Sequence, residues 1–93
     1  MSSDAKKGGQ CLYCNIKKIA GRLLFITPPP LTVVDKKLLA RIENDYYQEY
    51  RERTVVIDLI NATVDPALFA SLDHNKVKFI NHHHENIPAQ FQL

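Results

Sequence analysis

The stretch from Thr54 to Ile60 places the strongest constraint on how this chain folds. Its sequence, Thr-Val-Val-Ile-Asp-Leu-Ile, is apolar or β-branched at every position except Asp58. A run of this kind is typical of a parallel strand covered on both faces, whereas a strand with one wet face alternates. Asp65–Leu72 and Lys76–Ile80 follow it, so the region predicts a strand, a short helix and a second strand.

The ends of these elements are marked by residues with defined conformational preferences. Asp65 is a favourable N-cap, and Pro66 fits the first helical position because that position needs no backbone N–H. We therefore interpret Asp65 as a helix cap and not as a metal ligand. Lys76–Ile80 alternates polar and apolar residues, which predicts a strand with one wet face at the edge of the sheet.

The amino-terminal half adds a longer helix and one further strand. The pair Thr32 and Asp35 resembles a capping box, and it opens a predicted helix over residues 33–50. Spacings of three and four place one apolar stripe on that helix, formed by Val34, Leu38, Leu39, Ile42, Tyr46 and Tyr50. Leu23–Ile26 is a short apolar run that ends before three prolines, which predicts a buried strand. Residues 11–20 fit either a helix or a strand.

Length and element order together predict the fold class. Ninety-three residues suffice for one core, so we expect residues 11–93 to form a single α/β domain, preceded by a flexible basic tail over residues 1–10. Parallel strands are joined by right-handed crossovers. We therefore expect a small three- to four-stranded, mostly parallel sheet with two helices, in βαβαβ order.

The order of these elements resembles STAS domains, the modules found in anti-sigma-factor antagonists and sulphate transporters. The resemblance covers residues 31–72 and is carried by Pro30-Leu31, the helix 33–50, Val55-Val56-Ile57-Asp58-Leu59 and Asp65. It implies a partner-binding scaffold. In the family, a Ser or Thr after that Asp is phosphorylated to switch partner binding, but this chain has Pro66 and Ala67 there. The resemblance therefore implies no phosphorylation switch, and the family's final helix is short or missing after Ile80.

Charge and hydropathy limit the classes of partner. The net charge is +2, but residues 1–22 hold five Lys or Arg against Asp4, a local net charge of +4. This end can contact nucleic acid or an acidic protein. No run is long enough to cross a membrane, and the first ten residues lack the apolar centre of a secretory signal. We expect a cytoplasmic protein with no membrane partner.

Cys11 and Cys14 form a Cys-x-x-Cys pair that allows three interpretations. In the first, both thiolates bind one zinc ion, and His82 and His84, which would point the same way on a strand, complete the tetrahedral set. His74 and His83 are the remaining histidines. In the second, the cysteines form a redox pair, although no strand precedes Cys11 as in thioredoxin-like proteins. In the third, they are two small residues near a chain end without a site.

Two further features invite a functional interpretation. His82-His83-His84 is predicted to lie in a loop after the last strand; imidazoles titrate near pH 6.5, so a pH-sensitive contact is conceivable there. No nucleophile can be paired with them from the sequence. Asp58 is predicted to be in mid-strand, where we expect it to act as a cap or to pair with Lys or Arg at the edge of the sheet.

These observations favour a small non-catalytic regulatory or assembly module that binds a protein partner or a second copy of itself. The expected docking residues are the apolar ones near the carboxyl end, namely Ile87, Phe91 and Leu93. The alternative is a zinc-stabilised nucleic-acid or ribonucleoprotein component that uses Cys11 and Cys14 with His82 and His84. A thiol oxidoreductase is a third, weaker hypothesis.

Overall fold

A computed structural model describes residues 17–93 of the chain. The predicted tail of residues 1–10 and the Cys-x-x-Cys pair lie outside this range. Residues 17–20, which the sequence left ambiguous, form a strand. No helix in the described part of the chain is long and apolar enough to cross a bilayer.

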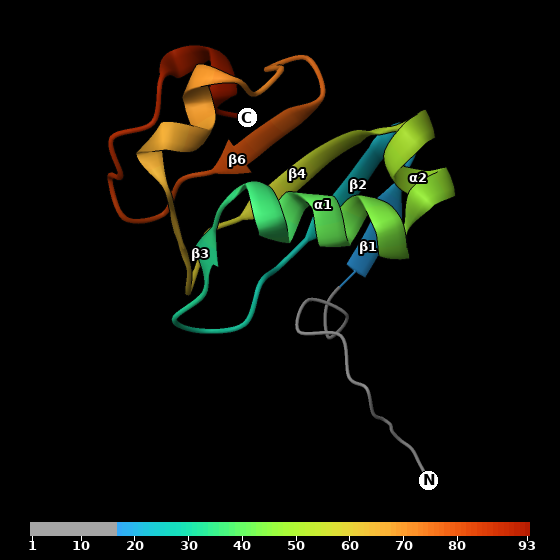
Figure 1. The fold of residues 1–93 in the computed structure, drawn as a ribbon, viewed down its shortest axis with the longest axis horizontal. Coiled ribbons are helices and arrows are strands. Elements are labelled where there is room, and N and C mark those ends of the chain that lie inside the picture. Colours follow the sequence, from blue (N-terminus) through green and yellow to red (C-terminus); the bar gives the residue numbers. More distant parts are fainter. Residues whose placement is uncertain (1–16) are drawn as a thin grey trace, which may run out of the picture.

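The main sheet has four strands in the order β1-β2-β4-β6. β1 (Lys17–Ala20) and β2 (Leu23–Ile26) form an antiparallel hairpin, whose turn contains Gly21 at φ +59°, a backbone conformation that glycine adopts without steric cost. β4 (Thr54–Asp58) runs parallel to β2, and β6 (Val77–Ile80) runs parallel to β4. The predicted fold class, a small and mostly parallel α/β sheet with helices, is confirmed (Figure 1).

The segment predicted as one helix over residues 33–50 is divided in the structure. It begins with β3 (Val33–Val34), which pairs in parallel with β5 (Thr63–Val64) in a small second sheet. Two adjacent β-branched valines favour this extended conformation over a helical one. α1 (Lys36–Asp45) and α2 (Tyr47–Glu52) follow, and the helix is interrupted at Tyr46, whose backbone is non-helical. The prediction of a single helix was therefore wrong at its start and in its middle.

Both predicted helix starts involve an aspartate that caps the backbone. Asp35 Oδ1 accepts a hydrogen bond from the Leu38 N–H at 2.9 Å, so Asp35, and not Thr32, is the N-cap of α1. Asp65 Oδ1 accepts from the Ala67 N–H at 3.1 Å, as predicted, with Pro66 next to it. The element that Asp65 caps is shorter than expected: it is a single 3₁₀ segment, η1 (Pro66–Ala70).

The hydrophobic core lies on one face of the main sheet, the face that α1 covers. Alternate strand residues point into it and are almost fully buried. They are Leu24 and Ile26 of β2, Val55 and Ile57 of β4, and Val77 and Phe79 of β6. Leu39 and Ile42 of α1 and Leu68 of η1 belong to the same core cluster. In Figure 1, α1 and α2 lie together in front of the sheet, on the same side.

The carboxyl-terminal residues complete this core. Ile87 is 5% exposed and Phe91, in η2 (Ala89–Phe91), is 2% exposed. The ring of Phe91 lies 4.8 Å from that of Phe69. The expectation that Ile87 and Phe91 dock into a partner is therefore wrong, because the chain buries both itself. Only Leu93, at 61% exposed, remains on the surface.

The sheet has unequal edges. β6 is an edge strand, as predicted, but its outer side is bridged by the last residues of the chain: the Leu93 N–H donates to the Phe79 carbonyl at 3.0 Å, and Gln92 pairs with Phe79. Bridging of this kind protects an edge from pairing with other chains. The opposite edge, β1, has no strand beyond it in residues 17–93.

Tyr50 gives the fold a testable dependence on alkaline pH. Burial, together with the negative charge of Glu43, raises the pKa of its phenol. The folded chain then holds the phenolic proton more tightly than the unfolded chain, so this contribution to stability is complete below about pH 10 and is lost as the pH rises through the raised pKa. Tyr50→Phe should therefore make the fall of the unfolding free energy above about pH 10 shallower in urea titrations. Tyr47→Phe, at an exposed position of the same helix, controls for loss of a hydroxyl. A slope unchanged by Tyr50→Phe would contradict the expectation.

Candidate functional site

The residues with the clearest potential for recognition lie on the second face of the main sheet, opposite α1. We use the name second face for the four apolar residues Leu23, Phe25, Val56 and Ile80. Strand alternation places them there, because each is next to a residue that points into the core. All helical members of the core cluster pack with residues of the other face, so no described helix covers this one.

The second face is apolar at its centre. Phe25 lies in register beside Val56, and Val56 lies beside Lys78 on the next strand. Val56 is fully buried and lies outside the core cluster, so neighbouring side chains on this side of the sheet already cover it. Leu23, Phe25 and Ile80 are half-buried. The prediction that β4 is apolar on both faces is thus confirmed by consecutive buried residues at 55, 56 and 57.

Lysines stand on both sides of this apolar centre. Lys18 pairs with Phe25 from β1, and Lys78 pairs with Val56 from β6, so a single row across the sheet reads Lys, Phe, Val, Lys. Lys18 is exposed. The ammonium of Lys78 donates to the Gln90 carbonyl at 2.9 Å, which draws it toward the β6 edge.

Asp58 and His82 form the rim of the second face at the carboxyl ends of the parallel strands. Asp58 is the last residue of β4 and points to the same side as Val56, two residues before it. Its carboxylate lies 2.6 Å from His82 Nε2 and also accepts from the Ile60 N–H at 3.1 Å. The predicted mid-strand position and the pairing with Lys or Arg were wrong, because β4 ends at Asp58 and its side-chain partner is His82, whereas the alternative role as a cap agrees with the contact to the Ile60 N–H. Carboxyl ends of parallel strands are where α/β sheets most often bind ligands.

Two of the three histidines, His82 and His83, reach the end of β4, and their ring centroids lie 6.2 Å apart. All three histidines lie in the irregular segment after β6, where a loop was predicted. His84 has φ +56°. Asn81 and Glu85 close this turn, since the Glu85 N–H donates to Asn81 Oδ1 at 3.0 Å. His83 Nε2 lies 2.6 Å from the Ile60 carbonyl oxygen. The expectation that His82 and His84 point the same way along a strand is therefore wrong, because no strand continues past Ile80.

Only part of the predicted zinc site lies among the described residues. Cys11 and Cys14, the predicted partners of His82 and His84, lie outside them. Within residues 17–93, no three His, Asp or Glu side chains gather as a metal-binding group. The ring of His74 packs edge-on against that of Phe91, with centroids 6.1 Å apart.

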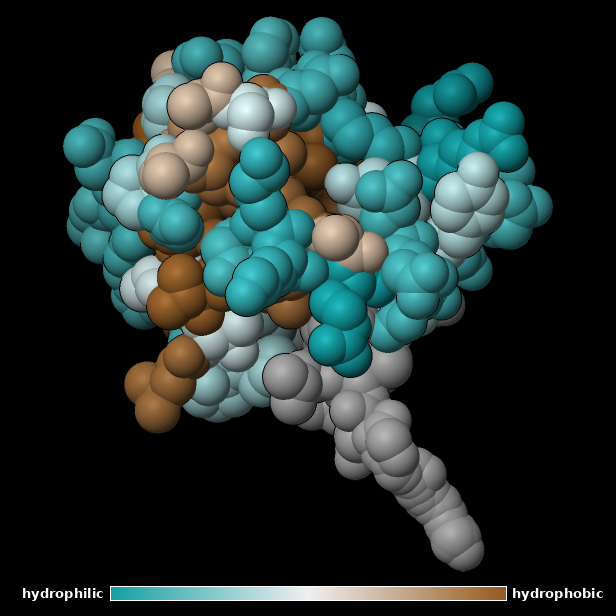
Figure 2. Space-filling view, viewed as in Figure 1, coloured by the Kyte–Doolittle hydropathy of each residue, from teal (hydrophilic) through white to brown (hydrophobic). Residues whose placement is uncertain are grey.

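Sequence reasoning missed the second face as a site because it predicted that the strand at Thr54–Ile60 is covered on both faces. The signal was present in β2, where Leu23 and Phe25 are apolar although they alternate with the core residues Leu24 and Ile26. The helix-covered side differs in the hydropathy of its surface. Figure 2 shows it, with hydrophilic side chains predominating over the helices.

Known proteins give no further guide to this site. No family model, curated protein or solved structure matches the chain.

Proposed function

We propose that this chain is a non-catalytic regulatory or assembly module that binds an amphipathic helix of another protein on the second face of its sheet. One observation carries the proposal: the parallel strands β2, β4 and β6 have helices on one side only in the described chain. Parallel sheets occur almost only with both faces covered. A helix supplied by a partner would cover the half-buried residues of this side, Leu23, Phe25 and Ile80.

The dimensions of the second face favour one helix over a second copy of the whole domain. Four strands at a spacing of about 4.8 Å give a width of roughly 14–19 Å, and four residues at about 3.3 Å give a length of roughly 13 Å. A helix of about ten residues is about 15 Å long. A stable dimer needs about 800 Å² from each partner, which is more than an area of this size supplies.

Charge defines the chemistry of that helix. Lys18 and Lys78 flank the apolar residues Phe25 and Val56. A helix with an apolar stripe and carboxylates on both sides of it would place its stripe on Phe25 and its charges beside the lysines. Complementary flanks of this kind fix the register and favour one partner over others.

The resemblance to STAS domains supports the same class of function. That family consists of partner-binding modules, and residues 31–72 follow its order of elements. At the position of the family's phosphorylated side chain, Pro66 and Ala67 carry no hydroxyl. We therefore propose an intracellular module whose binding to its partner is not switched by phosphorylation at this position.

The test is a titration with a synthetic helical peptide of about 14 residues that has a leucine stripe at spacings of three and four, flanked by Glu. The domain is expected to bind it more tightly than a matched peptide with Lys in place of every Glu. Fluorescence anisotropy measures both affinities. Equal affinities, or no binding of either peptide, would remove the proposal. A concentration-dependent dimer in light scattering that blocks the peptide would assign the face to a second copy instead.

We propose a zinc-stabilised nucleic-acid or ribonucleoprotein component as the second candidate. The observation that favours it is the position at which β1 begins. Its first residue, Lys17, pairs with Ile26 near the carboxyl ends of the parallel strands, which is also where Asp58 and His82 lie. Six residues from Cys11 to Lys17 can span up to about 20 Å, whereas three strand spacings from β1 to β6 amount to about 14 Å. The cysteines are therefore close enough along the chain to reach the histidines.

The histidine contacts are those that a zinc ligand needs. His82 is held through Nε2 by Asp58, and His83 is held through Nε2 by the Ile60 carbonyl, so each ring keeps Nδ1 for a metal. Metal-binding histidines are usually oriented by such a second contact. We propose Cys11, Cys14 and His82 as ligands, with His84 or its neighbour His83 as the fourth.

Elemental analysis of untagged protein tests this candidate. The expected result is about one zinc ion per chain, lost in Cys11→Ser and in His82→Ala and retained in His74→Gln. Comparing His83→Ala with His84→Ala identifies the fourth ligand. A metal-free protein with freely titrating thiols would contradict the zinc site.

A further inference from the structure

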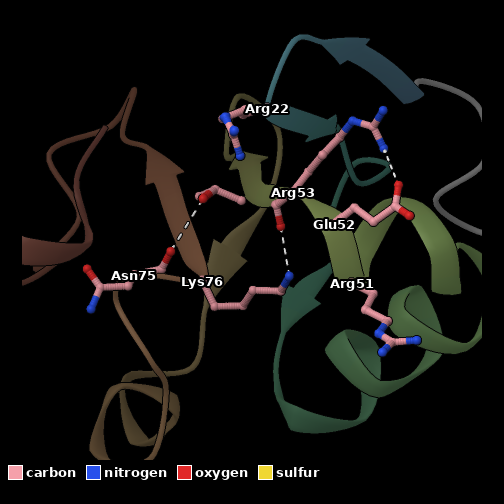
Figure 3. Close-up of a pocket in the computed structure, with 7 residues that line it drawn as sticks. Arg22, Arg51, Glu52, Arg53, Asn75 and Lys76 are labelled. Atoms are coloured by element: carbon pink, nitrogen blue, oxygen red, sulfur yellow. Dashed lines mark hydrogen bonds and ion pairs between the residues drawn. The ribbon is translucent and has the colours of Figure 1, made fainter.

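A second candidate site lies at the opposite end of the sheet, where the parallel strands begin. It is a pocket of about 230 Å³. The β1–β2 turn, the end of α2 and the turn before β6 meet there (Figure 3). Its lining residues are Arg22, Arg51, Glu52, Arg53, Thr54, Asn75 and Lys76. Four cationic side chains and one carboxylate give the pocket a formal charge of +3.

Two of the four cations hold the fold together. The ammonium of Lys76 donates to the carbonyl oxygens of Tyr50 and Arg53, the latter at 2.8 Å, and so offsets the negative carbonyl end of α2. Arg53 Nε donates to the Gly21 carbonyl at 3.1 Å, and its Nη1 lies 3.7 Å from a Glu52 carboxylate oxygen. The Glu52 carboxylate, the single negative group among the lining residues, is therefore paired with Arg53.

The other two cations have no such role. Arg22 and Arg51 are exposed, and neither has a hydrogen-bond or ion-pair partner among the described residues. The Arg51 guanidinium lies over the ring of Tyr47, 5.9 Å from its centroid. The two arginines come from different elements, the β1–β2 turn and α2, and Figure 3 shows the Arg51 side chain directed away from Arg22. A guanidinium presents paired N–H groups that match the oxygens of a phosphate.

We propose that this pocket binds a condensed phosphate group, such as the triphosphate of a small molecule. Its volume of about 230 Å³ corresponds to about eight water molecules at about 30 Å³ each, which is room for linked phosphoryl groups. Arg22 and Arg51 are the exposed guanidinium groups that can bind the phosphate oxygens, while Lys76 and Arg53 add positive potential nearby. This site is independent of the second face, so its test is independent of the proposed protein partner.

Calorimetric titration with sodium tripolyphosphate tests the proposal, with inorganic phosphate and ATP as comparison probes. The double variant Arg22→Gln/Arg51→Gln is expected to weaken tripolyphosphate binding by at least about tenfold, since each arginine loses a charge-assisted contact. Both side chains are exposed, so thermal unfolding should confirm that the variant is folded. ATP bound as tightly as tripolyphosphate would indicate that a nucleotide is accepted.

Arg41→Gln is the matched control, because Arg41 is an exposed arginine of α1 outside the pocket. It is expected to change the affinity by less than about twofold. An equal loss in the control would show that the whole basic surface attracts the anion, and would overturn the site. Absence of tripolyphosphate binding at low salt would also overturn it, as would tighter binding of an RNA oligonucleotide that is insensitive to Arg22 and Arg51.

Discussion

Phe79→Ala is expected to destabilise the protein by about 3–5 kcal/mol, the largest effect of any single substitution considered. Phe79 is fully buried at the centre of the core, and its ring lies 5.8 Å from that of Phe69 in an edge-on arrangement. Its removal leaves a cavity between β6 and η1. A domain of this size has a total stability of about 5–15 kcal/mol, so the variant loses a large part of it.

Urea denaturation followed by circular dichroism measures this loss. Leu93→Ala is the control: this residue is also apolar and near the last strand, but it is 61% exposed, and its replacement should change stability by less than about 0.5 kcal/mol. If Phe79→Ala cost no more than Leu93→Ala, the core arrangement described above would be wrong.

Phe25→Thr is expected to weaken binding of the acidic-flanked helical peptide by about thirtyfold or more. An aromatic residue at the centre of a binding surface typically contributes about 2 kcal/mol or more, and about 1.4 kcal/mol corresponds to a factor of ten. Threonine is a good strand residue, so β2 should persist. The substitution removes the central apolar contact and leaves the core residues Leu24 and Ile26 in place.

Lys18→Glu separates the electrostatic contribution from the apolar one. This reversal places a negative charge beside the acidic flank of the peptide, so binding should weaken and should also lose much of its dependence on salt. Lys37→Glu, at an exposed lysine of α1 on the other side of the sheet, is the matched control and should leave the affinity unchanged. Equal effects of the two reversals would show that the affinity for the peptide depends only on the net charge of the domain.

The fold was predictable where a local pattern and the tertiary structure agree. The apolar run at Thr54–Asp58, the cap at Asp65 and the alternation of Val77–Ile80 depend on neighbouring residues alone, and all three are confirmed. The pairing of Val33–Val34 with Thr63–Val64 depends on residues thirty positions apart, so helical spacing alone predicted the wrong element.

The candidate site was less predictable because it depends on which strands become neighbours. Asp58 and His82 are 24 positions apart and meet only because β4 and β6 are adjacent and parallel. The same holds for the pocket that joins Arg22 to Lys76. The composition of Ile87 and Phe91 suggested an exposed docking segment, but hydrophobicity alone does not reveal whether a residue meets a partner or its own core.

Methyl NMR of the wild-type domain, titrated with the acidic-flanked peptide, tests the binding surface most directly. Adjacent residues on the same strands provide the internal control. The methyl groups of Leu23, Val56 and Ile80 lie on the second face, whereas those of Leu24, Val55 and Ile57 point into the core. The proposed function predicts that the first set shifts on binding and that the second set does not. Shifts confined to α1, or shifts of the first set on deletion of residues 1–16 without any peptide, would contradict it.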